Sequence, residues 1–480
     1  MKLTRREFLK WSSMAAVGGA LAACAPSTPA PSAGGEAAEK AAPEKKEEEK
    51  VAAEKPVEIT YLVRSDIEIK MQKWTEISVQ EFMEQHPNIK VNVIGVPWGD
   101  YNAKLLALFA AGQPPEVSAN YAAGFATFYA NKAIAPLDDL VASNNIDLSE
   151  FEPKALEAVT REGKLWAMPL AHMPTIMFYN RDLFDEAGVE PPPTDWEDKS
   201  WTTEAVLEKA QALAKNVEDP LKAVWGLDFW SGQLGVASWL WGVDPFNNKG
   251  GPEYTEAYKT GLVTEVYYDA PKMVEAIQWF ADLTYQFKVA PRPSDMQAMQ
   301  QSVGWPMMSG KIAMEVHGGW HFSDFLNVQP SWKWGAAPYP YGPAGVNTTP
   351  LFNDSWMLSA GAKEPEAGFL LLKYLTTENG ARLYSQMTGF FPANKKFYDE
   401  WFDNVMKVPS IALTRDELVQ VMANSFAYGY ATPGKTLDRY PELNQAWSQT
   451  SAPIWNGEVS AAEGLAAVQE RFKTMIATWT

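Results

Sequence analysis

The chain has 480 residues, of which 46% are hydrophobic and 12% aromatic, and its formal net charge is −18 at pH 7. This content of apolar and aromatic side chains is enough to bury large cores, which excludes a chain that is disordered throughout. The acidic balance argues against nucleic acid as a partner, because phosphate contacts require clustered Lys and Arg. One cysteine and four histidines are too few for a disulfide framework or a Cys-based zinc site, and we expect neither a metal nor another cofactor.

Residues 1–23 are predicted to be a signal peptide. A basic start with Arg5 and Arg6 precedes a short apolar stretch of small residues, which is the order found in secretory signals. The paired arginines, followed by Phe-Leu-Lys, resemble the twin-arginine export signal, although a general secretory route tolerates two arginines too. Leu21-Ala22-Ala23-Cys24 resembles a bacterial lipobox. That resemblance implies cleavage before Cys24, lipid on its sulfur, and a protein anchored to the outer face of the cytoplasmic membrane.

Residues 24–56 are expected to form a lipidated cysteine followed by a disordered linker. Residues 25–56 contain no aromatic side chain and are rich in Ala, Pro, Glu and Lys, so they cannot bury enough apolar surface to fold. No apolar run long enough to cross a bilayer follows residue 24.

The folded part is predicted to begin with alternating strand and helix. Residues 57–63 and 89–94 alternate in polarity as strands do, and residues 68–86 have apolar residues at helical spacing. Asp100 is predicted to cap a helix over 101–111 that ends before Gly112. This order indicates an α/β layer with a mostly parallel sheet.

Further along the chain, helices outnumber strands. Helices are predicted at 180–187, 203–215, 271–288, 363–387 (two adjoining helices) and 460–478, and short strands at 223–229, 312–316 and 356–359. Few strands separated by long helical stretches favour a chain that crosses between two α/β lobes more than once.

No catalytic motif is recognisable. Gly-x-Ser-x-Gly, His-Glu-x-x-His, Walker and dinucleotide-binding patterns are all absent from the sequence. His317 and His321 are four residues apart, but the two glycines between them disfavour the helix that would make this spacing a metal site. Paired carboxylates of a secreted glycoside hydrolase stay open as a less favoured alternative, although no acidic pair lies in a distinctive motif. We therefore expect a binding protein and not an enzyme.

Aromatic residues after predicted strands are the better candidates for a functional site. Trp320 follows Gly318-Gly319, Tyr121 follows Ser118-Ala119-Asn120, Trp98 lies between Pro97 and Gly99, and Trp230 precedes Ser231-Gly232. Ligands of open α/β sheets gather at strand ends, and aromatic faces stack on sugar rings. The alternative for each of them is a place in the hydrophobic core.

Several stretches, in this order and spacing, resemble the extracellular solute-binding proteins of ABC importers, family 1, a sugar-binding type similar to maltose-binding protein. The stretches are Val96–Leu105 with Ala111–Val117, Gly163–Pro169 with Met177–Phe184, Met308–Met314 with Gly318–Trp320, and Phe352–Trp356 before the helix at 363–375. The resemblance covers about residues 57–480.

The resemblance implies a two-lobed α/β fold of the periplasmic-binding-protein type, with a ligand cleft between the lobes and several hinge crossings. Lobe one is expected at 57–168 plus 311–354, and lobe two at 169–310 plus 355–480. The family's ligand contacts fall at Tyr121 and Trp320 and near Trp230 and Tyr440. Arg64 and Asp354 are candidate partners of ligand hydroxyls, with a surface or hinge salt bridge as the alternative.

The resemblance also implies the partners. These are a carbohydrate, expected to be an oligosaccharide, the permease subunits of an ABC importer, and a membrane reached through the lipid anchor, with the protein itself a monomer. A peptide, polyamine or phosphorylated solute remains the alternative ligand of the same fold. Such a ligand would call for converging opposite charges in the cleft, where few are predicted.

Overall fold

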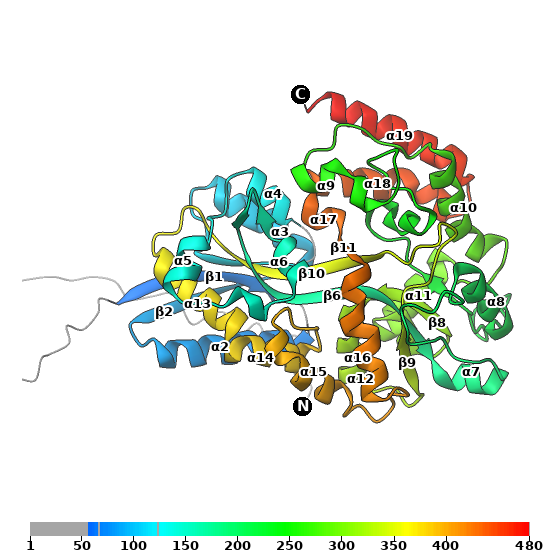
Figure 1. The fold of residues 1–480 in the computed structure, drawn as a ribbon, viewed down its shortest axis with the longest axis horizontal. Helices are drawn as coiled ribbons and strands as arrows, with labels where there is room; N and C mark the ends of the chain where they lie inside the picture. Colours follow the sequence, from blue (N-terminus) through cyan, green and yellow to red (C-terminus); the bar gives the residue numbers. More distant parts are fainter. Residues whose placement is uncertain (1–55, 66–67, 122–123, 480) are drawn as a thin grey trace, which may run out of the picture. The chain divides into compact units, whose positions relative to one another are not determined.

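The computed structural model describes residues 56–65, 68–121 and 124–479, whose arrangement is shown in Figure 1. The signal peptide, Cys24 and nearly all of the linker lie outside the described residues. The strands are β1 (Val57–Arg64), β2 (Ile89–Val96), β3 (Val117–Asn120), β4 (Thr160–Arg161), β5 (Lys164–Leu165), β6 (Met168–Asn180), β7 (Asp228–Phe229), β8 (Met314–Gly318), β9 (Trp334–Ala337), β10 (Thr349–Leu358) and β11 (Gly429–Ala431).

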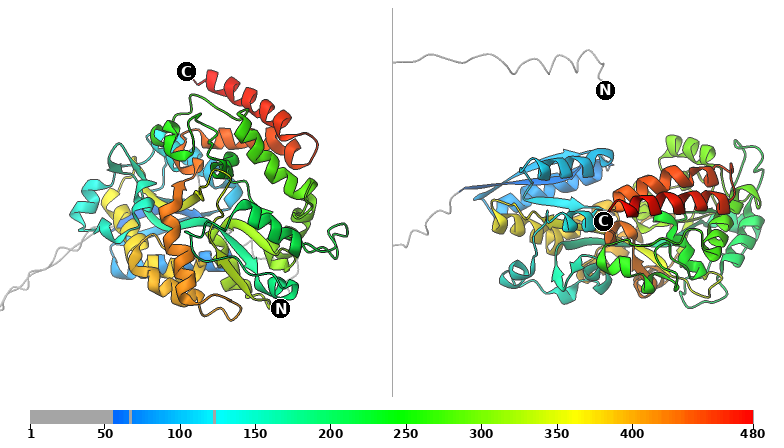
Figure 2. Two further views of the ribbon diagram at one scale, coloured as in Figure 1. Left: turned by 45° about the vertical axis from the view of Figure 1, so that its right-hand side comes forward. Right: turned by 90° about the horizontal axis from the view of Figure 1, so that it is seen from above.

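Helices flank these strands and build most of the second half of the chain. They are α2 (Glu68–Gln85), α3 (Trp98–Ala110), α4 (Phe125–Ala130), α5 (Asp138–Ser143), α6 (Pro153–Glu157), α7 (Arg181–Ala187), α8 (Thr203–Leu213), α9 (Glu256–Thr260), α10 (Pro271–Tyr285), α11 (Pro293–Val303), α12 (Phe322–Val328), α13 (Pro365–Thr377), α14 (Asn379–Thr388), α15 (Tyr398–Val405), α16 (Arg415–Ala423), α17 (Pro433–Thr436), α18 (Tyr440–Trp455) and α19 (Ala461–Ala477). Figures 1 and 2 show the last two helices side by side.

The central sheet has the strand order β2-β1-β3-β10-β6-β8-β7, with β11 added on β10 and β9 on β6. Strands β1, β2 and β3 are parallel, whereas β10 is antiparallel to both β3 and β6, and β8 is antiparallel to β6. The α/β class is confirmed, but the sheet is mixed and not mostly parallel. Its direction changes at β10, a strand from late in the chain that local sequence patterns could not place between β3 and β6.

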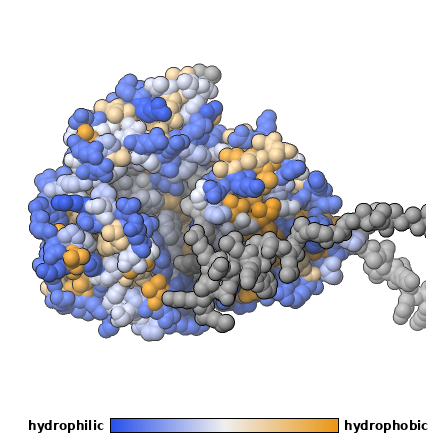
Figure 3. Space-filling view, turned by 180° about the vertical axis from the view of Figure 1, so that it is seen from behind, coloured by the Kyte–Doolittle hydropathy of each residue, from blue (hydrophilic) through white to orange (hydrophobic). Residues whose placement is uncertain are grey.

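Strand β6 runs through both lobes. Its residues 168–174 pair with β10, and its residues 175–180 pair with β8 and β9. All 13 residues of β6 are buried, so its sequence shows no polar alternation that would have marked it as one long strand. Figure 3, seen from the side opposite to Figure 1, shows the surface hollowed between the two lobes.

The strand pairing differs from the predicted lobe boundaries. Residues 311–354 were expected to return to lobe one, but β8 pairs with residues 175–179 and with β7, which belong to the expected second lobe. Residues 351–354 of β10 pair with β6, and the residues that pair with β3 of lobe one are 355–358, which were expected in lobe two. The sequence of residues 312–316 predicts a strand but carries no information about the strand's partner, so the pairing of this segment could not be predicted from it.

Local signals for helix ends agree with the structure in α7 and differ in α3. The Asn180 side chain accepts hydrogen bonds from the N–H groups of Asp182 and Leu183, and the helix ends at Gly188 with φ of 66°. Helix α3 begins at Trp98 after Pro97, so Asp100 lies inside its first turn and is not the cap. An acidic residue in the first turn is favoured by the helix dipole, which gives the same sequence signal as a cap.

Close packing of helix α8 against the strand region before β7 yields a stability prediction. A Cβ on Gly226 would lie 1.9 Å from the backbone oxygen of Ala210 in α8, so Gly226→Ala must push two backbone segments apart. We expect a loss of about 1–3 kcal/mol or more in the free energy of unfolding, measured by urea denaturation. Gly99→Ala is the control, because a Cβ there meets no atom within 4 Å. Equal stability of the two variants would contradict this packing.

Candidate ligand-binding site

Strand β10 organises the site, because its successive side chains on one face reach both lobes. Phe352, Asp354 and Trp356 alternate along this continuous strand and share a face. Phe352 contacts aromatic rings of the second lobe, and Trp356 packs against Tyr121 of the first lobe with ring centres 5.8 Å apart. Asp354, between them, is only 3% exposed.

An aromatic cluster surrounds Trp320 and consists of Trp230, His317, Trp320 and Phe352. The Trp320 ring meets the Phe352 ring edge-on at 4.8 Å between centres and the Trp230 ring at 6.2 Å. Trp230 stacks on His317 at 5.0 Å with an interplanar angle of 13°. Trp230, His317 and Trp320 are half-buried, so this cluster joins core packing to a partly accessible surface.

Gly318 is needed for the position of Trp320. A Cβ at Gly318 would lie 2.0 Å from Cζ3 of Trp320, which means that the indole rests directly on the Gly318 backbone. The N–H of Gly318 donates to Nδ1 of His317 at 2.9 Å, which fixes the neighbouring imidazole as an acceptor. Burial lowers the pKa of His317 well below its ordinary value, so the ring is neutral at physiological pH.

A polar cluster lies further along β10 and β3 and consists of Arg64, Asn120, Tyr121, Asp354, Tyr384 and Lys435. The backbone N–H of Arg64 donates to the Tyr121 hydroxyl at 3.3 Å, and the Arg64 guanidinium carbon lies 5.3 Å from the Tyr121 ring centre. The Tyr384 hydroxyl donates to Oδ2 of Asp354 at 3.0 Å. Burial raises the pKa of Tyr384 well above its ordinary value, so this hydroxyl keeps its proton.

Lys435 is the most deeply buried cation of this cluster, with 0% exposure. Its ammonium group donates to the backbone oxygen of Asn120 at 3.3 Å and also to the Asn120 side-chain oxygen. Burial lowers the pKa of Lys435 to about 7, although the charge of Asp354 acts in the opposite direction. Among the described residues, no carboxylate lies within ion-pair distance of Lys435.

Helix α17, which carries Lys435, bonds to both sides of the site. The N–H of Gly434 donates to Oε1 of Gln233 at 2.9 Å, and the Gly434 oxygen accepts from the N–H of Gly124 at 2.9 Å. The guanidinium of Arg161 donates to the Lys435 oxygen at 3.1 Å. Because the buried helix α17 bonds to Gly124 of the first lobe and to Gln233 of the second, it forms a bridge between the two lobes.

Tyr440 and Trp230 line one pocket of about 540 Å³, which extends along α18. Tyr440 is 6% exposed, and it opens the helix next to the bridging segment. A volume of this size lies within the usual range of small-molecule sites. The pocket therefore joins two residues that were predicted on separate loops.

The predicted site residues gather in two places. Trp230 and Trp320 meet in the aromatic cluster, and Arg64, Tyr121 and Asp354 contribute to the polar cluster. Trp98 begins α3, but its side chain lies outside the described part of the structure, as does Cys24.

Sequence reasoning missed His317, Phe352, Tyr384 and Lys435 as parts of the site. Phe352 lies two residues before Asp354, but the strand was predicted only at 356–359, so the face that these two residues share on β10 was not predicted. His317 joins the site because β7 pairs with β8 and brings it beside Trp230. The sequence gives no sign of that strand pairing. Nothing in the sequence around Lys435 indicates that this lysine is fully buried.

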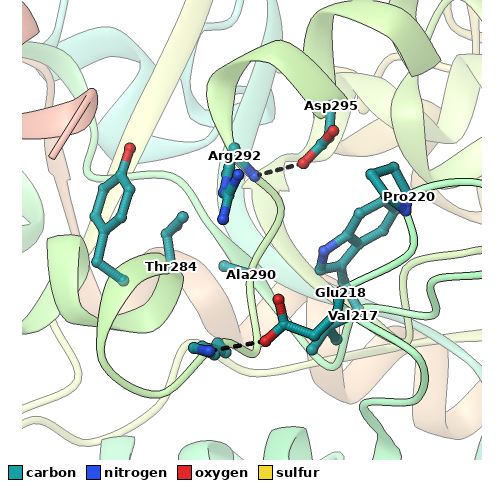
Figure 4. Close-up of a pocket in the computed structure, with 10 residues that line it drawn as sticks. Val217, Glu218, Pro220, Thr284, Ala290, Arg292 and Asp295 are labelled. Atoms are coloured by element: carbon teal, nitrogen blue, oxygen red, sulfur yellow. Dashed lines mark hydrogen bonds and ion pairs between the residues drawn. The ribbon is translucent and has the colours of Figure 1, made fainter.

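Figure 4 shows a different and smaller pocket of about 90 Å³, in the second lobe. Its lining includes Glu218, Arg292 and Asp295, and Glu218 accepts from the Lys288 ammonium group at 2.7 Å. Asp295 accepts from the backbone N–H of Arg292 at 3.3 Å, and none of the predicted ligand-binding residues lines this pocket.

In the described part of the chain, His, Cys, Asp and Glu side chains form no group of three or more that is placed to hold a metal ion. A membrane-spanning helix would need a longer apolar stretch than any helix among the described residues contains.

The comparison with known families identifies the chain. The family model of the bacterial extracellular solute-binding proteins matches residues 65–382, which is more than half of the sequence. The chain belongs to this family. The members of this family are extracellular solute-binding proteins.

Individual relatives agree with this assignment. The sn-glycerol-3-phosphate-binding periplasmic protein UgpB of Shigella dysenteriae is 23% identical over 425 residues, which cover 84% of this chain and 90% of UgpB. The ABC substrate-binding protein Lmo0181 of Listeria monocytogenes, in complex with cycloalternan, is similar in structure with a TM-score of 0.71 and 23% identity, covering 88% of this chain and 99% of that one. Maltose-bound MalE3 of T. maritima has a TM-score of 0.66 and 19% identity, with coverage of 87% and 100%. At these identities the structural likeness establishes the fold.

Lys435→Met tests the burial of the bridging lysine in this solute-binding protein. The folded-state pKa of about 7 lies below the ordinary 10.5, so between these pH values the unfolded chain binds more protons than the folded one. The unfolding free energy of the parent therefore gains from rising pH in this window, whereas the variant lacks this contribution. We expect the difference, parent minus variant, to rise by up to about 1.4 kcal/mol per pH unit between pH 7 and 9 in urea melts.

The exposed Lys407 provides the matched control, since Lys407→Met removes a lysine that remains in water. Its pH profile should run parallel to that of the parent. A Lys435→Met profile that is also parallel would show that the ammonium group is not buried in solution.

Proposed function

We propose that this solute-binding protein captures a carbohydrate, expected to be an oligosaccharide, and delivers it as a monomer to the permease of its ABC importer. The observation that carries the proposal is the aromatic cluster, in which the half-buried Trp230, His317 and Trp320 surround the buried Phe352, while Asp354, two residues further along β10, accepts from the Tyr384 hydroxyl. Aromatic faces contribute apolar contact area, while carboxylate and hydroxyl groups bond sugar hydroxyls. The sugar complexes of Lmo0181 and MalE3, two proteins with this fold, support the same class of ligand.

A phosphorylated solute is the second candidate. It is favoured by Lys435, a buried ammonium group whose hydrogen bonds to Asn120 leave its charge without a carboxylate partner among the described residues. Ligand phosphate oxygens could supply that partner. UgpB, a relative over most of this chain, supports this alternative by its name.

Calorimetry of the purified protein separates the two candidates. Maltose, cellobiose, mannobiose and longer saccharides form one panel, and glycerol 3-phosphate with inorganic phosphate forms the other. We expect heat of binding and a raised melting temperature with a saccharide, because a ligand at 100 times its Kd stabilises the folded state by about 2.7 kcal/mol. Binding of glycerol 3-phosphate without binding of any saccharide would decide for the second candidate.

Trp320→Ala tests the sugar-stacking role. We expect binding of the saccharide identified in the panel to weaken by roughly 2 kcal/mol, the scale of an aromatic anchor, with little loss of folding stability because the ring is half-buried. Gly318→Ala should weaken binding in the same direction, since a Cβ displaces the indole. Calorimetry and a denaturant melt are measured on each variant.

The control is Trp332→Ala, which removes another half-buried tryptophan that packs on Phe325 at 6.1 Å, away from the aromatic cluster. If Trp320→Ala lowers stability by about 3–5 kcal/mol and leaves saccharide affinity at the parental value, Trp320 is a core residue and the stacking role is wrong.

We also propose that Cys24 anchors the protein to the outer face of the cytoplasmic membrane after removal of residues 1–23. The support is the lipobox-like Leu21-Ala22-Ala23-Cys24 followed by a polar linker. Cys24→Ser should shift the protein from the membrane fraction to the soluble extracytoplasmic fraction, because no sulfur is left for the lipid. Ser27→Ala nearby is the control and should keep the parental distribution. Membrane retention of Cys24→Ser would contradict lipid anchoring.

A further inference from the structure

A groove runs along helix α18 and begins at the aromatic cluster. We call it the α18 groove; it is lined by Trp230 and Gln233, which follow β7, and by Tyr440, Asn444, Ser448 and Trp455, which follow one another along α18 from its first residue to its last. Its volume is about 540 Å³. Trp230 belongs both to this groove and to the aromatic cluster, so the two surfaces are continuous.

The lining of the α18 groove carries no charge. Among the described residues that line it, every polar side chain is an amide, a hydroxyl or an indole N–H. Three other pockets of the molecule, of about 90, 630 and 350 Å³, each contain both acidic and basic side chains. An uncharged groove on a protein with net charge −18 favours a neutral ligand rich in hydroxyl groups, because amides and hydroxyls both donate and accept hydrogen bonds.

The helix presents these groups in a row. Tyr440, Asn444, Ser448 and Trp455 are spaced by four, four and seven residues, which places them along one face of α18. The helix has 16 residues and is therefore about 24 Å long. The row thus suits an extended ligand and not a single compact one.

The far end of the groove offers a ring that is held in place. Nε1 of Trp455 donates to the Ser451 hydroxyl at 3.0 Å, and the backbone oxygen of Trp455 accepts from the Tyr285 hydroxyl at 2.7 Å. Trp455 is half-buried, so part of its indole is accessible. Trp447, in contrast, is 6% exposed and stacks on Tyr268 at 5.2 Å, which makes it part of the floor.

We propose that the α18 groove binds the outer units of a neutral oligosaccharide whose first units lie at the aromatic cluster, with Trp455 as the stacking residue at the far end. This inference rests on the proposed carbohydrate function and adds a second section to that site. It makes chain length a determinant of affinity, because longer saccharides gain contacts with Asn444, Ser448 and Trp455 that a disaccharide cannot reach.

The test measures Kd by calorimetry for ladders of malto-, cello- and manno-oligosaccharides from the disaccharide upward. In the parent protein, affinity should rise with chain length in one of the ladders. Trp455→Ala should weaken binding of the longest saccharide about tenfold or more and leave the disaccharide unchanged. Ser448→Arg, at an exposed position of the helix, should have the same selective effect, because it places bulk and charge in the groove while sparing the fold.

Trp479→Ala is the matched control, since Trp479 is also half-buried but lines a different pocket. It should leave every Kd unchanged. Equal affinity of the parent for short and long saccharides, or equal effects of Trp455→Ala on both, would overturn the groove assignment while the carbohydrate function stands. A parent that binds no saccharide of any length would overturn the proposed function and the groove with it.

Discussion

The burial of strand β10 is the constraint on which the rest of the structure depends. All ten of its residues are buried, and they pair with β3, β6 and β11, so this strand joins the lobes through backbone hydrogen bonds. Three consecutive residues of the strand, Asn353, Asp354 and Ser355, are polar. A buried polar group without a partner costs free energy, and among the described residues Oδ1 of Asn353 and the Ser355 hydroxyl have none, whereas the carboxylate of Asp354 does. The Tyr384 hydroxyl is that partner, which draws α14 to the centre of the molecule.

The same constraint explains why the candidate site lies where it does. The alternation of β10 places Phe352 and Asp354 on the same face of the strand. Phe352 packs on the Trp320 ring, and Asp354 accepts a hydrogen bond from the Tyr384 hydroxyl. Lys435 adds a further cost, because a fully buried ammonium group is expensive unless it is well bonded. Groups whose pKa is strongly shifted by burial, as that of Lys435 is, cluster at functional sites. The position of Lys435 on α17, between the two lobes, agrees with this tendency.

The sequence alone predicted those elements whose signals are local. Strands β1 and β2, helix α2 and the capped ends of α7 follow from alternation, helical spacing and Asn180 with Gly188. The long strand β6 was not predicted at its full length, because a strand buried on both faces shows no alternation. Strand partners, and with them the course of residues 311–354, depend on contacts across the chain that no local pattern records. For the candidate site, Trp230 and Trp320 were predicted as aromatic residues after strands. The contact of the Trp320 ring with the Gly318 backbone and the burial of Lys435 are visible only in three dimensions.

The two ends of the site differ in chemistry, and this difference limits what can bind across both. The polar cluster contains charged side chains, of which Asp354 accepts from the Tyr384 hydroxyl and Lys435 donates to the Asn120 amide oxygen. The α18 groove contains no charged side chain among its described lining residues and offers rings, amides and hydroxyls instead. An anion would be bound at the first end and would gain nothing from the second. A chain of sugar units can use both, because its hydroxyls bond to charged and to neutral groups and its ring faces pack on indoles. Trp230 joins the α18 groove to the aromatic cluster, and β10 carries Phe352 of that cluster two residues from Asp354, so this arrangement supports the proposed carbohydrate ligand.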